Sequence, residues 1–313
     1  PPPSPSTPPA VPPPLVPPPP LVPPPPRPPP PPVYETRSGY ALAATIPGPA
    51  QSVAMSTDGT RIGLGPHRND CADAANNGCA GPSGEWRVVE RTNDGNWVQA
   101  GYLPADITIL PREWDSIALN HDGTVVAVWG QQSSGSGDHT LRVYEVASGS
   151  GPSDPWVQRG QTLTNSNFDH VSLSADGSVL AYGDNAHASG FGVVRVFQYD
   201  PNAPSNSQWG KIGQDMTVPS GSTGRQSYGE HVALSADGLT IFASAAYHDG
   251  PHTNTGIAMV HTYDAGSNTW NRKGDALYGE ASSYQADGPY GISISADGTR
   301  IAYGTPWGGP GDD

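Results

Sequence analysis

The hydrophobic and polar positions between residues 52 and 304 repeat one pattern five times. In each copy an alternating apolar segment leads to Asp-Gly, and a second alternating segment follows. A period of two is typical of half-buried β-strands, and Asp-Gly between two such strands is a strong signal for a β-hairpin. We therefore predict five hairpins. They are SVAMSTDGTRIGLG from Ser52, SIALNHDGTVVAVWG from Ser116, HVSLSADGSVLAYGD from His170, HVALSADGLTIFASA from His231 and GISISADGTRIAYGT from Gly291.

A further strand and a tryptophan follow each of the first four hairpins. The strands WRVVERT, LRVYEVA, VVRVFQYD and IAMVHTYD each precede a Trp that has a Gly four residues later. These pairs are Trp97/Gly101, Trp156/Gly160, Trp209/Gly213 and Trp270/Gly274. One four-stranded sheet cannot bury both of its faces, so units repeating at roughly 60 residues must stack on one another. The pattern predicts the blades of a β-propeller, with each Trp packed between blades.

The fifth hairpin lacks the two outer strands of its unit. Similar segments stand at the other end of the body, VYETR at Val33–Arg37 and YALAATI at Tyr40–Ile46. Here Tyr40 occupies the Trp position and Ala44 the Gly position. We therefore predict an all-β, five-bladed β-propeller of four-stranded blades over residues 33–313, closed by these N-terminal strands. Closure against the last hairpin would remove the exposed sheet edges.

The succession S-x-D-G, A-x-G and V-R-V-Y resembles FG-GAP-like and WD40-like propeller repeats over about residues 33–304. This resemblance implies the fold and says little about function, because propellers carry many unrelated activities. The integrin-type loop D-x-D-x-D-G is absent, so the resemblance implies no calcium. The Trp-Asp dipeptide of WD40 repeats is also absent from the strand ends.

The first 32 residues form a separate, proline-rich stalk, because 22 of the 37 prolines lie there. Proline fixes φ and has no N–H to donate, which excludes a helix or a central strand. The remaining conformation is polyproline II. We therefore predict two parts, a polyproline II stalk over residues 1–32 and a propeller over residues 33–313.

The Ser-Pro and poly-Pro pattern of this stalk resembles the hydroxyproline-rich cell-wall glycoproteins of green algae and plants. The resemblance implies hydroxylated prolines that carry O-linked sugars, and two serines as further acceptors. The implied positions are Ser4, Pro5, Ser6, Pro8, Pro9, Pro12, Pro13, Pro14, Pro17, Pro18, Pro19, Pro20, Pro23, Pro24, Pro25 and Pro26. Two other interpretations stay open: a cytosolic ligand for profilin, SH3 or WW modules, and a plain spacer.

Composition narrows the partners and the compartment. The formal net charge is −14, with 15 Lys and Arg against 29 Asp and Glu, so nucleic acid is not expected as a partner. No apolar run reaches the length of a transmembrane helix. Cys71 and Cys79 close the polar loop CADAANNGC, which favours a disulfide and an oxidising compartment over two free thiols. A zinc site would need two further ligands, and no metal or other cofactor is expected.

Candidate chemistry lies seven residues before each turn aspartate. The five residues there are Gln51, Asp115, Asp169, Glu230 and Tyr290. If the first strand of each hairpin lines a central channel, the three carboxylates at Asp115, Asp169 and Glu230 would form an acidic rim at its mouth. Glycoside hydrolysis needs paired carboxyl groups, so these three are weak catalytic candidates. A solvated rim, or carboxylates that cap a neighbouring loop, is the structural alternative.

Histidines in the loops after the second strands are a second candidate group for a metal or a sugar. They are His67, His139, His187, His248 and His252, accompanied by Asp70, Asp138, Asp184 and Asp249. Their spacing defines no single site, so scattered surface histidines explain them equally well.

From these features we expect an extracellular structural glycoprotein, secreted to a cell wall or cell-surface fibre, and no enzymatic activity. It would self-associate into a filament or matrix with other wall or surface glycoproteins. A stalk-tethered glycoside hydrolase and a carbohydrate-binding or adhesion module are the alternatives.

Overall fold

The structure, a computed structural model, describes part of the chain. The described residues are 50, 52–65, 86–100, 109–110, 116–132, 139–146, 156–165, 168–219, 226–249, 255–279 and 291–304. The chain divides into two units, Pro1–Leu42 and Ala43–Asp313, and every described residue belongs to the second. The predicted stalk, the closing strands at 33–46 and the cysteines at 71 and 79 lie outside the described residues.

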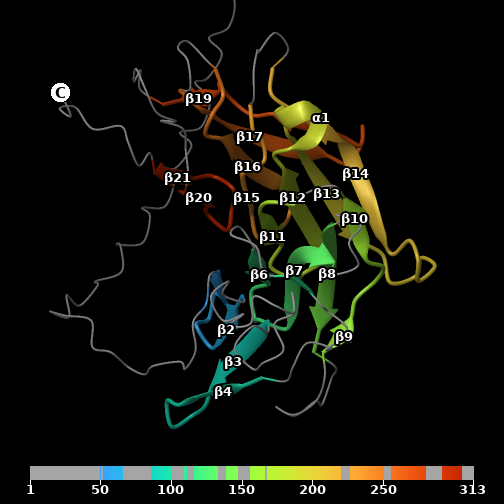
Figure 1. The fold of residues 1–313 in the computed structure, drawn as a ribbon, viewed down its shortest axis with the longest axis vertical. Helices are drawn as coiled ribbons and strands as arrows, with labels where there is room; N and C mark the ends of the chain where they lie inside the picture. Colours follow the sequence, from blue (N-terminus) through green and yellow to red (C-terminus); the bar gives the residue numbers. More distant parts are fainter. Residues whose placement is uncertain are drawn as a thin grey trace, which may run out of the picture. The chain divides into compact units, whose positions relative to one another are not determined.

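The first and third blades are antiparallel four-stranded sheets whose strand order follows the chain (Figure 1). The first contains β1 Val53–Met55, β2 Arg61–Leu64, β3 Arg87–Arg91 and β4 Trp97–Gln99. The third contains β11 Val171–Leu173, β12 Val179–Asp184, β13 Val193–Tyr199 and β14 Trp209–Met216. A four-residue helix, α1 His187–Gly190, stands between β12 and β13.

The second and fourth blades have the same four strands and gain short additional ones. The second contains β6 Ile117–Leu119, β7 Val125–Gln132, β8 His139–Glu145 and β9 Val157–Gln158, with β5 Ile109–Leu110 on β7 and β10 Leu163–Asn165 on β8. The fourth contains β15 His231–Leu234, β16 Thr240–Ala245, β17 Ile257–Asp264 and β18 Thr269–Arg272, with β19 Leu277–Tyr278 on β17.

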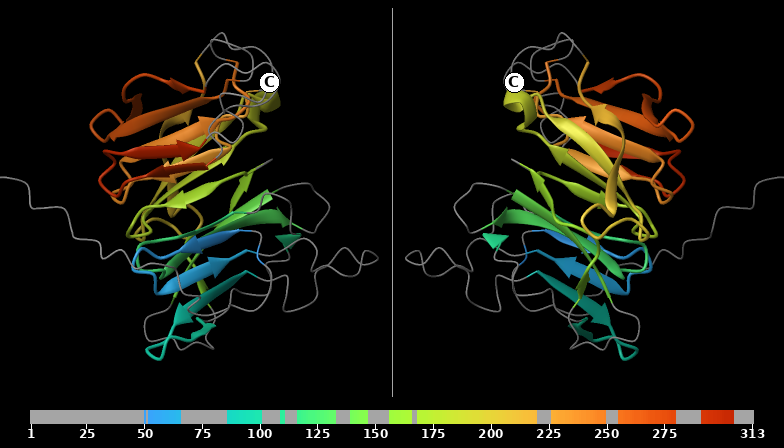
Figure 2. Two further views of the ribbon diagram at one scale, coloured as in Figure 1. Left: turned by 90° about the vertical axis from the view of Figure 1, so that its left-hand side faces the viewer. Right: turned by 90° about the vertical axis from the view of Figure 1, so that its right-hand side faces the viewer.

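The fifth repeat is described as a two-stranded terminal hairpin, β20 Gly291–Ile294 and β21 Ile301–Gly304. All five predicted hairpins are therefore confirmed, and the four-stranded unit is confirmed for four repeats. Neighbouring repeats in the chain are also neighbours in space (Figure 2), since β1 packs on β6, β6 on β11, β11 on β15 and β15 on β20. The described part of the chain is thus a propeller-type array of blades.

In each Asp-Gly turn the aspartate accepts a hydrogen bond from the backbone N–H two residues later, and in four of the five turns it also accepts one from a serine two residues earlier. In the first blade, Ser56 Oγ donates to Asp58 Oδ1 at 2.6 Å, and the Thr60 N–H donates to the same oxygen at 3.0 Å. Gly59 has a φ of +70°, a left-handed conformation that glycine adopts without strain. The bonds from Ser56 and Thr60 lower the pKa of Asp58 to about 2. The turn aspartates are therefore structural, as the sequence predicted.

Consecutive turns are joined by a continuous series of backbone hydrogen bonds. The residue before each turn aspartate donates its N–H to the carbonyl oxygen of its counterpart in the next repeat. The series runs from Thr57 to His121 (2.8 Å), His121 to Ala175 (3.0 Å), Ala175 to Ala236 (2.8 Å) and Ala236 to Ala296 (2.9 Å). These turn-to-turn bonds link all five described repeats at one end of the blades.

A second connection between blades uses the predicted Trp and Gly positions. The buried indole of Trp209 donates from Nε1 to the Arg159 carbonyl of the preceding blade at 2.7 Å. A Cβ on Gly160 would lie 2.6 Å from Trp209 Cδ1, so only glycine lets the ring pack there. Trp156 makes the same bond to the Ala100 carbonyl at 2.6 Å. The predicted packing between blades is confirmed for Trp156, Trp209 and Trp270. The segment predicted to precede the blade of Trp97 lies outside the described residues.

A glutamine amide locks the outer strands of adjacent blades together. Gln214 Nε2 donates to the Trp270 carbonyl at 2.6 Å, and the Trp270 N–H donates to Gln214 Oε1 at 2.9 Å. Gln161 makes the same pair of bonds with Trp209, at 2.8 and 2.9 Å. Among side chains, only a primary amide can both donate and accept in this way. The glutamine therefore pairs with the backbone N–H and C=O of the tryptophan as a neighbouring strand would.

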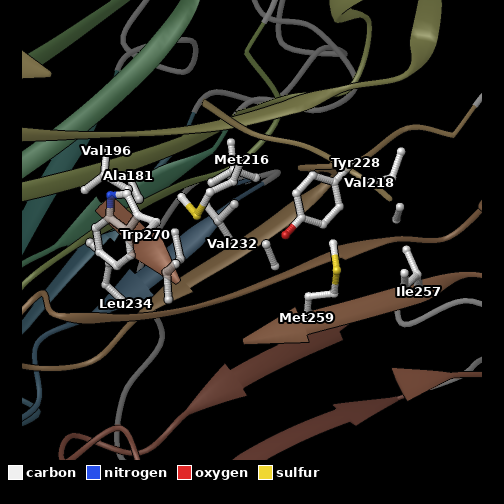
Figure 3. Packing of buried hydrophobic residues seen from close by; sticks show 14 of the residues in the cluster. Ala181, Val196, Met216, Val218, Tyr228, Val232, Leu234, Ile257, Met259 and Trp270 are labelled. Atoms are coloured by element: carbon white, nitrogen blue, oxygen red, sulfur yellow. The ribbon is translucent and has the colours of Figure 1, made fainter. Parts of the chain in front are cut away.

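The hydrophobic clusters lie between blades rather than within them. Figure 3 shows one of these clusters, where side chains of the third blade meet those of the fourth. It includes Ala181, Val196, Met216, Val218, Tyr228, Val232, Leu234, Ile257, Met259 and Trp270. Burying one Val or Leu side chain contributes about 2 kcal/mol, so each blade is stabilised mainly by its neighbours.

The turn glycines give a first test of this packing. Gly238 and Gly59 have φ values of +69° and +70°, but a Cβ on Gly238 would lie 2.6 Å from Val179 Cγ2, whereas one on Gly59 would meet nothing within 4 Å. Both Gly→Ala variants should lose about 1 kcal/mol from the left-handed backbone. We expect Gly238→Ala to lose about 1–3 kcal/mol more through overpacking. Urea unfolding measures both, and equal losses would contradict the packing.

The amide bridge gives a second test. A glutamate at position 214 could accept from the Trp270 N–H but could no longer donate to its carbonyl. We therefore expect Gln214→Glu to lower the free energy of unfolding by about 0.5–1.5 kcal/mol, because the part-buried carbonyl of Trp270 loses its hydrogen bond. Gln198→Glu is the matched control, because Gln198 makes only long contacts of 3.5 Å to Ser178. Thermal melts that fall equally for both variants would refute the bridge.

Candidate functional site

Two of the three predicted rim carboxylates are described, and both bind backbone. Asp169 Oδ2 accepts a hydrogen bond from the Asn185 N–H at 2.7 Å, and Glu230 Oε2 accepts one from the Ala246 N–H at 3.3 Å. Each carboxylate precedes the first strand of its hairpin, and its partner follows the second strand. In both blades the side chain therefore ties the start of the hairpin to its exit, which is close to the capping role considered as the structural alternative.

The remaining predicted site residues lie outside the described residues. These are the third rim carboxylate, Asp115, with Gln51 and Tyr290 of the same column, the loop residues His67, Asp70, Asp138 and His252, the cysteines Cys71 and Cys79, and all stalk positions proposed for glycosylation. Their predicted roles stay predictions.

The described histidines of the loop group lie in separate surroundings. His139 is buried on β8 and stacks on Trp129 with ring centroids 5.6 Å apart. His248 is buried and stacks on Tyr278 at 6.1 Å, and burial lowers its pKa. His187 in α1 is half-buried, and its Nδ1 lies 3.8 Å from Oδ2 of the buried Asp184. Two of these three histidines are thus packing residues.

A pair of histidines on the inner strands was not predicted as a site. His170 and His231 open equivalent strands of the third and fourth blades, and their rings meet edge to face with centroids 5.4 Å apart. Burial lowers the pKa of His170, opposed by a hydrogen bond with the backbone of Val232. Burial, and then the charge of His170, lower the pKa of His231 to about 4. Both rings are therefore neutral at pH 7.

The sequence does contain a signal for this pair. The motifs HVSLSADG and HVALSADG place a histidine at the same repeat position, where the other repeats have Ser52, Ser116 and Gly291. Aligning the repeats as columns would have brought the two together, because equivalent positions of neighbouring inner strands are adjacent.

No set of three or more His, Cys, Asp or Glu side chains in the described residues is arranged to hold a metal ion. No helix in that same part of the chain has the length and apolarity required to cross a bilayer.

The histidine pair predicts how stability depends on pH. Because the pKa of His231 is about 4 in the folded chain and 6.5 for an unperturbed histidine, the unfolded state binds the proton first as the pH falls. The free energy of unfolding should therefore decrease between pH 6.5 and 4, by at most about 3 kcal/mol from this residue. His231→Gln should flatten the decrease. The half-buried His187→Gln is the control, and urea unfolding at pH 7 and pH 5 measures the slopes. An unchanged slope in His231→Gln would contradict the assignment.

No protein-family model matches the chain. No curated protein matches it either.

Solved structures similar to this chain include β-propeller proteins. A protein assigned as a 6-phosphogluconolactonase, from Bacteroides uniformis, is 15% identical with a TM-score of 0.44, covering 83% of this chain and 79% of that chain. TolB from Acinetobacter baumannii is 14% identical with a TM-score of 0.43, covering 79% of this chain and 47% of that chain. Hydrazine synthase from Kuenenia stuttgartiensis is 12% identical with a TM-score of 0.44, covering 82% and 71%. Likeness at this level does not extend to activity.

Proposed function

We propose that the chain is an extracellular structural glycoprotein. Its blades form a rigid node, its proline-rich stalk is a glycosylated rod, and copies self-associate into a surface fibre or cell-wall matrix. Five blades and a disulfide between Cys71 and Cys79 belong to the same proposal.

The observation that carries the proposal is the use of the rim carboxylates. Asp169 and Glu230 are the described candidates for hydrolytic chemistry, and each accepts a hydrogen bond from the backbone of its own blade. The same use at equivalent positions of two blades indicates a structural role that repeats with the fold. A glycosidase would instead present paired carboxyl groups to a bound sugar.

The joints between blades supply the rigidity that a node needs. Turn-to-turn bonds, tryptophan contacts and glutamine bridges connect the same positions of successive blades. Charged residues make up only 14% of the whole chain, and only two of them are lysines, Lys211 and Lys273. A surface of this kind stays soluble through Ser, Thr, Asn and Gly, and attached O-glycans would add to that.

The stalk decides between the proposed function and its alternatives. In the chain isolated from its source, we expect mass spectrometry of residues 1–32 to find hydroxyprolines that carry sugars, because the resemblance to cell-wall glycoproteins implies them. We also expect sedimentation to detect species larger than the monomer. Unmodified prolines would revive the cytosolic ligand interpretation. A glycosidase activity lost in folded Asp169→Asn and Glu230→Gln variants would favour the enzyme, and specific glycan-array binding by residues 33–313 would favour the adhesion module.

A further inference from the structure

The described array ends in two faces that its own blades leave uncovered. On the first blade, Val53 and Met55 are 67% and 63% exposed. The residues equivalent to Val53 in the next three blades, Ile117, Val171 and Val232, are at most 6% exposed because they pack against the preceding blade. Of the residues equivalent to Met55, Leu173 and Leu234 are 8% exposed and Leu119 is half-buried. Val53 and Met55 thus have the position and chemistry of residues that pack between blades, without a blade in front of them.

The turn glycine of the first blade, Gly59, likewise has no described side chain packed on it. A Cβ on Gly123, Gly177 or Gly238 would lie within 2.8 Å of a side chain three residues after the preceding turn aspartate, namely Arg61, Val125 or Val179. A Cβ on Gly59 would meet no atom of the described residues within 4 Å. Among the described residues, Gly59 therefore lacks the side chain of a preceding blade that packs on the equivalent glycine of each later turn.

The terminal hairpin presents the matching half. Its Arg300 follows Asp297 by three residues, is exposed, and corresponds to Arg61 of the first blade. Arg61 packs on Gly123 and donates from Nη1 to the Gly123 carbonyl at 3.2 Å. Ala302, also exposed, corresponds to Gly63, the small residue against which Ile117 packs. Arg300 and Ala302 are therefore equipped to receive a first-blade face.

The series of turn-to-turn bonds ends in complementary groups. Its last donor would be the Ala296 N–H and its first acceptor the Thr57 carbonyl, and among the described residues neither group has a hydrogen-bond partner. A bond between them would continue the series with the same polarity as the four bonds already present.

We propose that the terminal hairpin of one copy docks on the first blade of a second copy. Ala296 would donate to the Thr57 carbonyl, Arg300 would pack on Gly59, and Val53 and Met55 would pack against Ala302. The contact repeats the joint found between blades inside the chain. It rests on the proposed self-association and supplies the surfaces that mediate it.

A second copy is the occupant that the described arrangement favours. Among the described strands, β1 packs on β2 and β6, whereas β20 packs on β15, β16 and β21, and the large exposure of Val53 and Met55 shows that the two ends do not cover each other. Two different surfaces that fit each other make a heterologous contact, which extends into a filament unless its rotation closes a ring. Closure of one chain through residues 33–46, predicted from the sequence, is the competing arrangement.

Engineered disulfides distinguish these arrangements in the full chain. In the variant Thr57→Cys/Ala296→Cys, we expect oxidation to form bonds between copies, seen as a ladder of multimers on non-reducing gels and as a 57–296 peptide by mass spectrometry. Ala175→Cys/Ala236→Cys is the positive control, because these residues already share a turn-to-turn bond of 2.8 Å within the chain. It should crosslink at monomer mass.

Each other outcome overturns the proposal in a recognisable way. A 57–296 bond at monomer mass would show closure within one chain. Multimers without the 57–296 bond would support self-association but contradict docking of the terminal hairpin on the first blade. A monomer without the bond, in both sedimentation and crosslinking, would remove the joint and the proposed self-association together.

A substitution at Gly59 tests the proposed contact independently, through the association constant. Asparagine tolerates the left-handed conformation, so Gly59→Asn should fold like the parent chain while its side chain blocks Arg300 of the next copy. We expect the association constant to fall by at least about tenfold, measured by sedimentation. Gly95→Asn is the matched control, since Gly95 has a φ of +87° and only a distant Arg91 atom, 3.8 Å away, near its Cβ position. Equal association by the two variants would overturn the proposal.

Discussion

The backbone hydrogen bond between consecutive Asp-Gly turns is the constraint on which the described structure depends. It sets each blade at one position relative to the next, because the bonded turn also fixes where its glycine meets the preceding side chain. The tryptophan at the outer edge then reaches a carbonyl of the preceding blade, and a glutamine amide pairs with its backbone. The hydrophobic clusters fill the space between these two lines of bonds. A blade taken alone would expose most of what stabilises it.

Polar residues near the inner strands take part in the same arrangement. Asp169 and Glu230 each accept a hydrogen bond from the backbone at the exit of their own hairpin, which connects its two ends. His170 and His231 fill the contact between two inner strands as neutral rings, since burial opposes their protonation. The two carboxylates that the sequence suggested as catalytic candidates and the two histidines that it did not suggest as a site all contact neighbouring strands or their ends.

An array built from one repeated joint has a consequence at its ends. Every internal blade contacts a described blade on both of its faces, whereas the first blade and the terminal hairpin each do so on one face only. Because the free face of the first blade and that of the terminal hairpin are complementary and not identical, copies joined through them would keep the same direction along a fibre. Such growth would need no contact of a new kind.

The five hairpins, the four-stranded unit and the tryptophan contacts were all predictable from sequence, because strand alternation, Asp-Gly turn chemistry and the Trp-to-Gly spacing are local signals that recur in every repeat. The short added strands and the backbone partner of Asp169 were not predictable. A histidine shared by two repeats marks His170 and His231 in the sequence, but their contact depends on how the blades stack. The bridge from Gln214 joins residues 56 positions apart, and no local pattern marks its partner. Only the stacking of blades brings these groups together, since that packing determines which distant backbone groups each side chain can reach.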